Sequence, residues 1–140
     1  MGEIVVDRGL ETFTIVDKKG TVLGAFEMNP SDMELIKRYE HVAENISHLA
    51  DDINVDESTN MVEVLKVLEG RMQEQIDYLF NAPVYADIFK ITSPFTMLAS
   101  GDLFMENVLN AIGKLIEAET GKKFKKIQTK VNKYAVKYHG

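Results

Sequence analysis

The chain has 140 residues, of which 45% are hydrophobic and 27% charged, a composition typical of a soluble globular domain with one core. It has no cysteine, which excludes disulfides, thiolate nucleophiles and Cys-type zinc sites. No apolar run approaches the roughly 20 residues that span a bilayer, and the acidic start at Met1–Asp7 is unlike a secretory signal. We therefore expect one domain, residues 1–140, in the cytoplasm.

The net charge of −6 is unevenly distributed along the chain. Residues 1–119 contain all 22 acidic residues and nine basic ones, whereas the segment after Glu119 contains seven lysines and no acidic residue. A chain polarised in this way either folds its basic end onto its acidic body or offers that end to an acidic partner.

The first 29 residues predict a small β unit. Residues 3–6 are a β-branched run that predicts an edge strand, and residues 12–16 alternate apolar and polar side chains as a half-buried strand does. Residues 17–20 (DKKG) form a turn, because Asp begins and Gly ends it. The returning strand places four residues on one face: Val22, Gly24, Phe26 and Met28. We predict a hairpin of two strands, or three if residues 3–6 pair.

A junction at Asn29 and Pro30 ends the strand, because proline disfavours a helical conformation in the residue before it. Ser31, followed three residues later by Glu34, matches a capping box and predicts the start of a helix. Apolar residues at three- and four-residue spacing continue this helix to about residue 52.

Residues 30–119 predict a helical body. A second helix covers about 58–81, and Gly70 inside it leaves room for close approach of a neighbouring backbone. The segment from residue 84 to 99 is apolar without helical period, and a further helix runs from about 101 to 119. The apolar arc of that helix is wide, which indicates either the centre of the core or a core face that merges into a contact face.

Thr120 and Gly121 predict a helix stop, so residues 120–140 should form a separate amphipathic helix over about 122–138. Its basic surface consists of Lys122, Lys123, Lys126, Lys130, Lys133 and Lys137, with Lys125 beside them. Such a helix suits a membrane surface, a nucleic acid, or an apolar and acidic protein surface. We favour docking on the acidic body or on a second protein, because the whole chain is acidic and this segment has no arginine.

Two patterns could carry chemistry, and we interpret each as structural. His41, Glu44 and His48 lie on one helix face, but we favour a solvated polar face over zinc because the apolar stripe lies opposite. Thr120–Lys123 is similar to the end of a phosphate-binding loop, yet the glycine required five residues earlier is missing. We expect no catalytic residue, metal, cofactor or enzymatic activity.

The sequence thus predicts an α+β protein, with an N-terminal β-hairpin packed on a mainly α-helical body of four to five helices. Its seven methionines together suit an adaptable binding surface, whereas gap-filling in a helical core is the better explanation of any single one. We place the partner-binding surface in and after the least periodic apolar stretch, at Phe89, Phe95, Met97, Phe104 and Met105.

The pattern of the chain resembles the small tail assembly chaperones encoded by siphophages and prophages of Gram-positive bacteria. The resemblance spans most of the chain and lies in five segments: 24–32 (GAFEMNPSD), 37–40 (KRYE), 77–80 (DYLF), 87–89 (DIF) and 102–109 (DLFMENVL). It implies a non-enzymatic helper that acts in the bacterial cytoplasm, coats the tape-measure protein and recruits tail-tube subunits. In many members a ribosomal frameshift appends a second domain, and Lys122–Lys123 or Lys125–Lys126 could be encoded by slippery codons.

Alternatives stay open at this point. The chain could be another phage morphogenesis protein, such as a tail completion or head–tail connector component, or a small nucleic-acid-binding regulator that uses the lysine-rich helix. Homo-oligomers are also compatible with the sequence.

Overall fold

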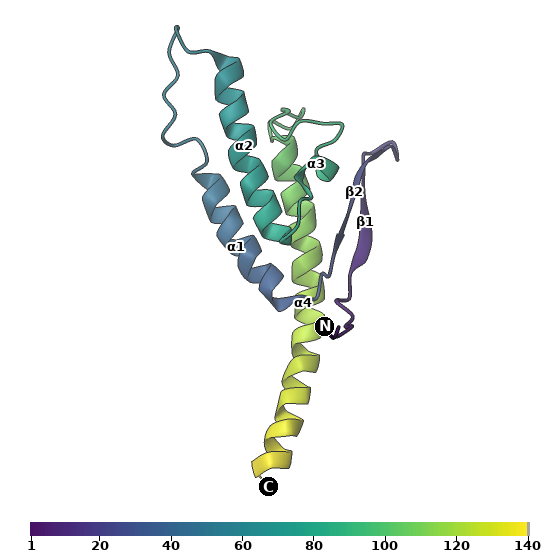
Figure 1. Ribbon diagram of the computed structural model, residues 1–140. Coiled ribbons are helices and arrows are strands. Elements are labelled where there is room, and N and C mark those ends of the chain that lie inside the picture. Colours follow the sequence, from purple (N-terminus) through teal and green to yellow (C-terminus); the bar gives the residue numbers. More distant parts are fainter. Residues whose placement is uncertain (140) are drawn as a thin grey trace.

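The computed structural model describes the backbone of residues 1–139 and the side chains of residues 1–131. The elements follow in the order β1 (Glu11–Val16), β2 (Val22–Met28), α1 (Met33–Ser47), α2 (Met61–Phe80), α3 (Tyr85–Ile88) and α4 (Phe104–His139) (Figure 1). A two-stranded hairpin with four helices confirms the predicted α+β fold.

The hairpin is antiparallel and contains a β-bulge. Ile15 pairs with Gly24 and Val16 with Val22, so that Leu23 has no partner opposite it. Because β2 has one residue more than β1 at this point, the alternation of inward and outward side chains along β2 shifts by one residue. Leu23 is therefore buried, like Phe26 and Met28 further along, while Val22 is 54% exposed. The prediction that Val22 shares the inner face was wrong for this reason.

The predicted edge strand at residues 3–6 is also wrong, because residues 1–10 form no strand in the described structure. Ile4 and Val5 are 92% and 91% exposed. A turn at Gly9, with a φ of 66°, directs this segment away from β1, and the backbone N–H of Gly9 donates to Asp7 Oδ1 at 2.8 Å. The hairpin thus has two strands rather than three.

α1 begins one residue later than the capping-box pattern predicts. Asp32 is the N-cap, and its Oδ1 accepts from the backbone N–H of Glu34 at 3.0 Å. Ser31 instead donates its backbone N–H to Asn29 Oδ1 at 2.9 Å, which closes a tight turn at the junction. Asparagine commonly competes for nearby backbone groups in this way, and this competition explains the displaced cap.

α2 is bounded by two asparagines. The side chain of Asn60 accepts from the backbone N–H groups of Val62 and Glu63, and Asn81 ends the helix with a left-handed φ of 51°. Gly70 lies on an exposed side of α2 with open space around it, so the predicted close approach of another backbone there was wrong.

α4 is one continuous helix from Phe104 to His139, and the predicted stop at Thr120 and Gly121 was wrong. Gly121 has a helical conformation, since one interior glycine costs only about 1 kcal/mol and good helix formers flank it on both sides. Lys122 pairs with Glu119 at 4.0 Å across the glycine.

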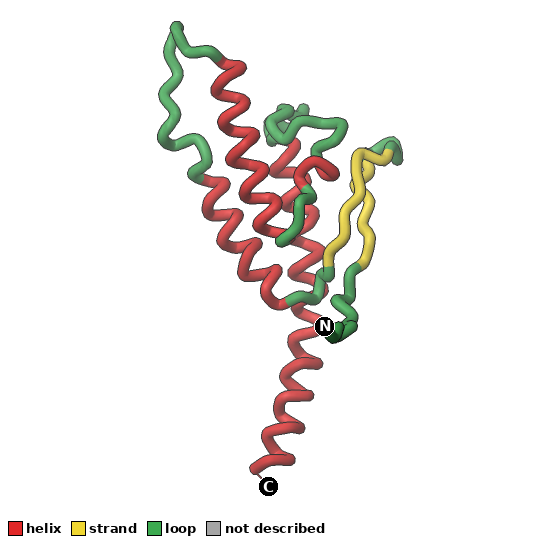
Figure 2. Tube along the Cα trace, viewed as in Figure 1, coloured by secondary structure: helices red, strands yellow, loops and turns green. Residues whose placement is uncertain are grey.

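The helices and the hairpin surround a single cluster of buried apolar side chains. α1 packs on α2 and on α4, whereas β2 packs on α3. Figures 1 and 2 show α4 running through the middle, with the α1–α2 pair on one side and the hairpin on the other. Every element except β1 contributes fully buried or nearly buried residues: Leu23, Phe26, Met28, Leu35, Val42, Met72, Ile76, Leu79, Phe80, Val84, Ile88, Phe104, Met105, Val108, Leu109, Ile112 and Ile116.

Candidate partner-binding site

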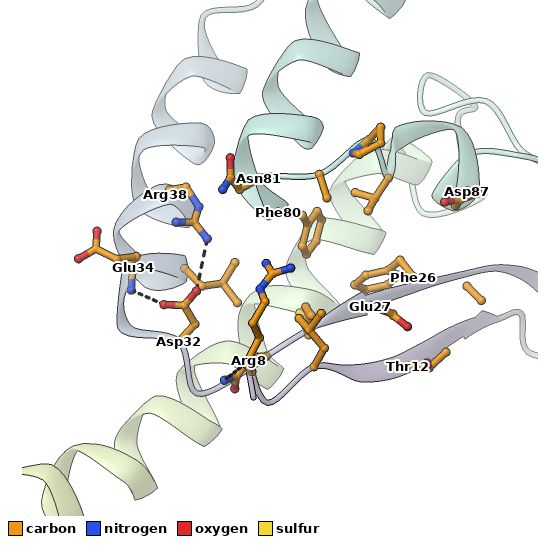
Figure 3. Close-up of a pocket in the computed structure, with 18 residues that line it drawn as sticks. Arg8, Thr12, Phe26, Glu27, Asp32, Glu34, Arg38, Phe80, Asn81 and Asp87 are labelled. Atoms are coloured by element: carbon orange, nitrogen blue, oxygen red, sulfur yellow. Dashed lines mark hydrogen bonds and ion pairs between the residues drawn. The ribbon is translucent and has the colours of Figure 1, made fainter. Parts of the chain in front are cut away.

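The strand-to-helix junction lines a cleft of about 760 Å³ between the hairpin, the start of α1 and the end of α2 (Figure 3). Arg38 connects the two helices: its Nε donates to the Leu79 carbonyl at 2.9 Å, and its Nη2 lies 3.6 Å from Asp32 Oδ2. One guanidinium thus binds the C-terminal end of α2 and the N-cap of α1. Cations are favoured at helix C-termini, so this contact stabilises the junction.

The remaining polar contacts in this cleft are also internal. Asn29 Nδ2 donates to the carbonyl of Arg8 at 3.0 Å and so holds the N-terminal segment against the junction. Below these groups the rings of Phe26 and Phe80 pack with centroids 5.0 Å apart. We interpret the cleft as architectural, because its best placed polar groups already have partners within the chain.

A second cavity, an apolar groove of about 920 Å³, separates the hairpin from α4. We call it the hairpin–α4 groove. One wall consists of Phe13, Ile15 and Leu23 of the hairpin, and the other of residues on α4 and in the loop before it, namely Leu98, Ala99, Val108, Ala111, Ile112 and Leu115. Asp17, Lys18, Lys19 and Asp102 also line it and bring charge of both signs to the groove.

The groove exists because only one strand of the hairpin joins the core. Leu23, Phe26 and Met28 of β2 are buried, whereas the inner-face residues of β1, Phe13 and Ile15, are only half-buried. Phe13 packs on Phe26 with ring centroids 6.1 Å apart and otherwise faces the groove. Leu115 on α4 is likewise half-buried, so apolar surface remains on both walls.

The five residues predicted as a partner surface do not lie together on one exposed surface. Phe104 and Met105 are 8% and 7% exposed and belong to the core, so assigning them to an exposed surface was wrong. Phe89 and Phe95 are half-buried against the core, and Phe89 meets Phe104 edge-on at 6.0 Å. Met97 alone of the five is largely exposed, at 70%.

The residues that sequence reasoning missed are Phe13, Ile15, Leu23 and Leu115. The alternation in residues 12–16 pointed to Phe13 and Ile15, and the wide apolar arc of α4 pointed to Leu115, whereas the burial of Leu23 depends on the β-bulge. The wide arc is a core face that continues into the groove wall, because Ile112 is buried while Ala111, one residue earlier, is exposed and lines the groove.

The lysines of the predicted basic surface lie on the part of α4 that extends beyond the body (Figure 1). Lys122, Lys126 and Lys130 are exposed and Lys123 is half-buried, whereas the side chains of Lys133 and Lys137 lie outside the described residues. The apolar residues between them, Phe124, Ile127 and Val131, are 57%, 39% and 58% exposed. Within the described part of the chain, this segment therefore does not dock on its own acidic body.

The polar face at the end of α1 forms local bonds. His48 hydrogen-bonds Asp51 Oδ2 at 2.6 Å and Glu44 Oε1 at 3.2 Å, and these two carboxylates raise the pKa of His48. The ring of His41 packs edge-on against Tyr78 at 5.6 Å. Nearby, hydrogen bonding to Arg71 lowers the pKa of Asp52. Among the described residues, no group of three His, Asp or Glu side chains could hold a metal ion.

Comparisons of the chain with protein-family models, with curated proteins and with solved structures gave no match. Within the described residues, no helix combines the length and the apolar character needed to cross a membrane.

Proposed function

We propose that this protein is a non-enzymatic binding protein that holds an apolar helix of a larger partner in the hairpin–α4 groove. The observation that carries this proposal is the groove itself: about 920 Å³, apolar on both walls and bordered by charges of both signs. Exposed apolar surface of this kind on a folded chain marks interaction sites.

The shape of the groove favours a helical partner. On the α4 wall, Val108, Ala111 and Leu115 recur at three- and four-residue spacing and so form a ridge along the helix. A second amphipathic helix can lay its own ridge beside this one, with Phe13 and Ile15 covering it from the hairpin side. The charged residues Lys18, Lys19 and Asp102 would then orient the polar edge of the bound helix.

The identity of the partner follows from the family resemblance. We propose that the chain is a phage tail assembly chaperone, that its partner is the tape-measure protein, and that it recruits tail-tube subunits in the cytoplasm of the bacterial host. A tape-measure protein presents long apolar helices that aggregate when free, and a soluble protein with an apolar groove is suited to cover them.

Co-expression tests this proposal. The wild-type chain should keep segments of the tape-measure protein soluble and elute with them as a complex. Ala111→Glu places a charge on the groove wall at an exposed position, so it should abolish the complex while the protein stays folded.

Asn110→Glu is the matched control, because it adds the same charge at the neighbouring exposed position, which does not line the groove. The proposal fails if Ala111→Glu binds as well as Asn110→Glu does, or if the tape measure stays insoluble with the wild-type chain. Electron microscopy of finished particles adds a second criterion, because a chaperone, unlike a tail completion or connector protein, is absent from the mature tail.

A further inference from the structure

The apolar face of α4 continues past the end of the folded body. Ile116 is fully buried, whereas Phe124, Ile127 and Val131 further along the helix are 57%, 39% and 58% exposed. Their three- and four-residue spacing places these three residues on one face, which we call the distal stripe. The body thus leaves a stripe of large apolar side chains uncovered.

The charges around the distal stripe restrict what can cover it. Lys123 and Lys130 each immediately precede a stripe residue, and the chain has no acidic residue after Glu119. Two distal stripes packed together would therefore place lysines beside lysines, which is unfavourable. The surface that covers the stripe should be apolar and acidic.

The same chain carries such a surface at its other end. Residues 51–65, which we call the acidic tip, contain five acidic residues, Asp51, Asp52, Asp56, Glu57 and Glu63, and no basic residue. Three of these carboxylates have cationic partners just outside the segment, in His48, Arg71 and Lys66, and the acidic residues still outnumber those partners. Three apolar side chains of the acidic tip, Val55, Met61 and Val62, are 58%, 58% and 61% exposed.

The apolar part of the tip has a clear structural origin. α1 ends at Ser47, and the loop that follows leaves the first turns of α2 without a helix beside them. The lower part of the α2 stripe, at Met72, Ile76 and Leu79, is fully buried, whereas Met61 and Leu65 at its start are exposed. The acidic tip thus exposes the first turns of the apolar face of α2, whose later turns belong to the core.

We propose that the distal stripe of one copy packs on the acidic tip of a second copy, so that the protein associates head to tail. Both surfaces are uncovered and apolar, and their charges are opposite. Figure 1 shows the α1–α2 loop at one end of the molecule and the C-terminal half of α4 at the other, so one copy does not close this contact on itself. A heterologous contact of this kind extends into a chain or closes into a ring.

Sedimentation velocity of the full-length chain over a range of protein concentrations tests the proposal. Oligomers should form, and raising NaCl from about 0.05 M to about 0.5 M should weaken the association, because it screens exposed charge pairs. A monomer at every concentration overturns the proposal. If that monomer binds anionic vesicles or DNA, the lysines around the distal stripe serve to bind lipid or nucleic acid instead.

A charge exchange makes the test specific. Lys123→Glu with Lys130→Glu, or Glu57→Lys with Glu63→Lys, should each lower the association constant on the order of tenfold by placing like charges opposite one another. In an equimolar mixture of these two double variants, the reversed distal stripe of one variant meets the reversed acidic tip of the other. That contact should have the same affinity as the contact in the wild type. That rescue excludes misfolding as the cause of the loss.

Lys90→Glu with Lys114→Glu is the matched control, since these exposed lysines belong to neither surface and do not line the hairpin–α4 groove. This variant should associate like the wild type. Equal weakening by all three double variants, or a mixture that fails to recover, overturns the proposal. The outcome is independent of tape-measure binding, which is read from the hairpin–α4 groove variants.

Discussion

Gly113 and Gly70 both lie inside helices, but their surroundings differ. Gly113 in α4 faces Tyr39 of α1, and a methyl group there would overlap the tyrosine hydroxyl, which donates to the Leu109 carbonyl at 3.0 Å. Burial, with a contribution from Glu117, raises the pKa of Tyr39. Gly70 in α2 faces open space. The first glycine is required by packing, and the second is only a weak point in its helix.

Opposite effects on stability follow for these two glycines. Gly70→Ala should stabilise the protein by about 0.5–1 kcal/mol, because alanine loses less backbone entropy in a helix. Gly113→Ala should destabilise it by about 1–3 kcal/mol, because Tyr39 must move from its hydrogen bond. Chemical denaturation of both variants measures the two changes, and shifts of the same sign would contradict this account.

The hydrogen bonds of His48 predict that the stability of the folded protein depends on pH. Its carboxylate partners Asp51 and Glu44 raise its pKa above the ordinary 6.5. Because the folded pKa is the higher one, the stability from this contact is fully present below pH 6.5 and is lost as the pH rises through the folded pKa. Thermal unfolding of the wild type and of His48→Gln should therefore differ at acidic pH and converge at alkaline pH. A difference that grows with pH would refute the assignment.

At the scale of single elements, the start of α1 shows which residue caps the helix. Asp32→Ala should cost about 0.5–2 kcal/mol, because the side chain accepts from the Glu34 amide and also faces Arg38. Ser31→Ala is the control: Ser31 uses its backbone N–H toward Asn29, and alanine keeps that group. Equal destabilisation by the two substitutions would mean that the N-cap is at Ser31 after all.

Another element-scale property is the tight contact between β2 and α3. A methyl group at Gly24 would overlap the backbone carbonyl of Asp87, so the strand and the short helix approach each other only because residue 24 has no side chain. Since β1 contributes only half-buried residues, this contact and the buried face of β2 hold the hairpin on the body.

At the scale of the whole molecule, the body and the distal half of α4 differ in what stabilises them. Within the described residues, all the buried side chains of α4 lie between Phe104 and Ile116, in the core that the other elements share. The distal stripe, in contrast, is exposed. The body should therefore be able to fold without the distal segment.

Truncation tests this independence. A chain that ends after Gly121 should unfold within a few degrees of the full-length midpoint, because the large apolar side chains described beyond that point, those of Phe124, Ile127 and Val131, are exposed. The comparison is made at a concentration where the full-length chain is monomeric, so that association does not contribute. A large fall in the midpoint of the truncated chain would show that the segment stabilises its own body.

The local features of this protein follow from short stretches of its sequence. The hairpin follows from the alternation in residues 12–16 and from the turn at 17–20, where Asp17 Oδ1 accepts from the Lys19 amide at 2.8 Å. The position of α2 follows from its apolar spacing and from Asn81, and the polarity of the chain follows from the absence of acidic residues after Glu119. These features depend on neighbours within a few residues, so a pattern in the chain reveals them.

Which apolar faces are covered depends on long-range packing. Phe104 and Ile127 are both on apolar faces of α4, yet one is core and the other is exposed, because the body ends between them. The β-bulge at Leu23 and the continuation of α4 through Gly121 likewise depend on long-range packing and on the sum of many weak propensities. This packing leaves the hairpin–α4 groove and the distal stripe uncovered. The periodicity of apolar residues in the sequence does not distinguish a covered face from an uncovered one.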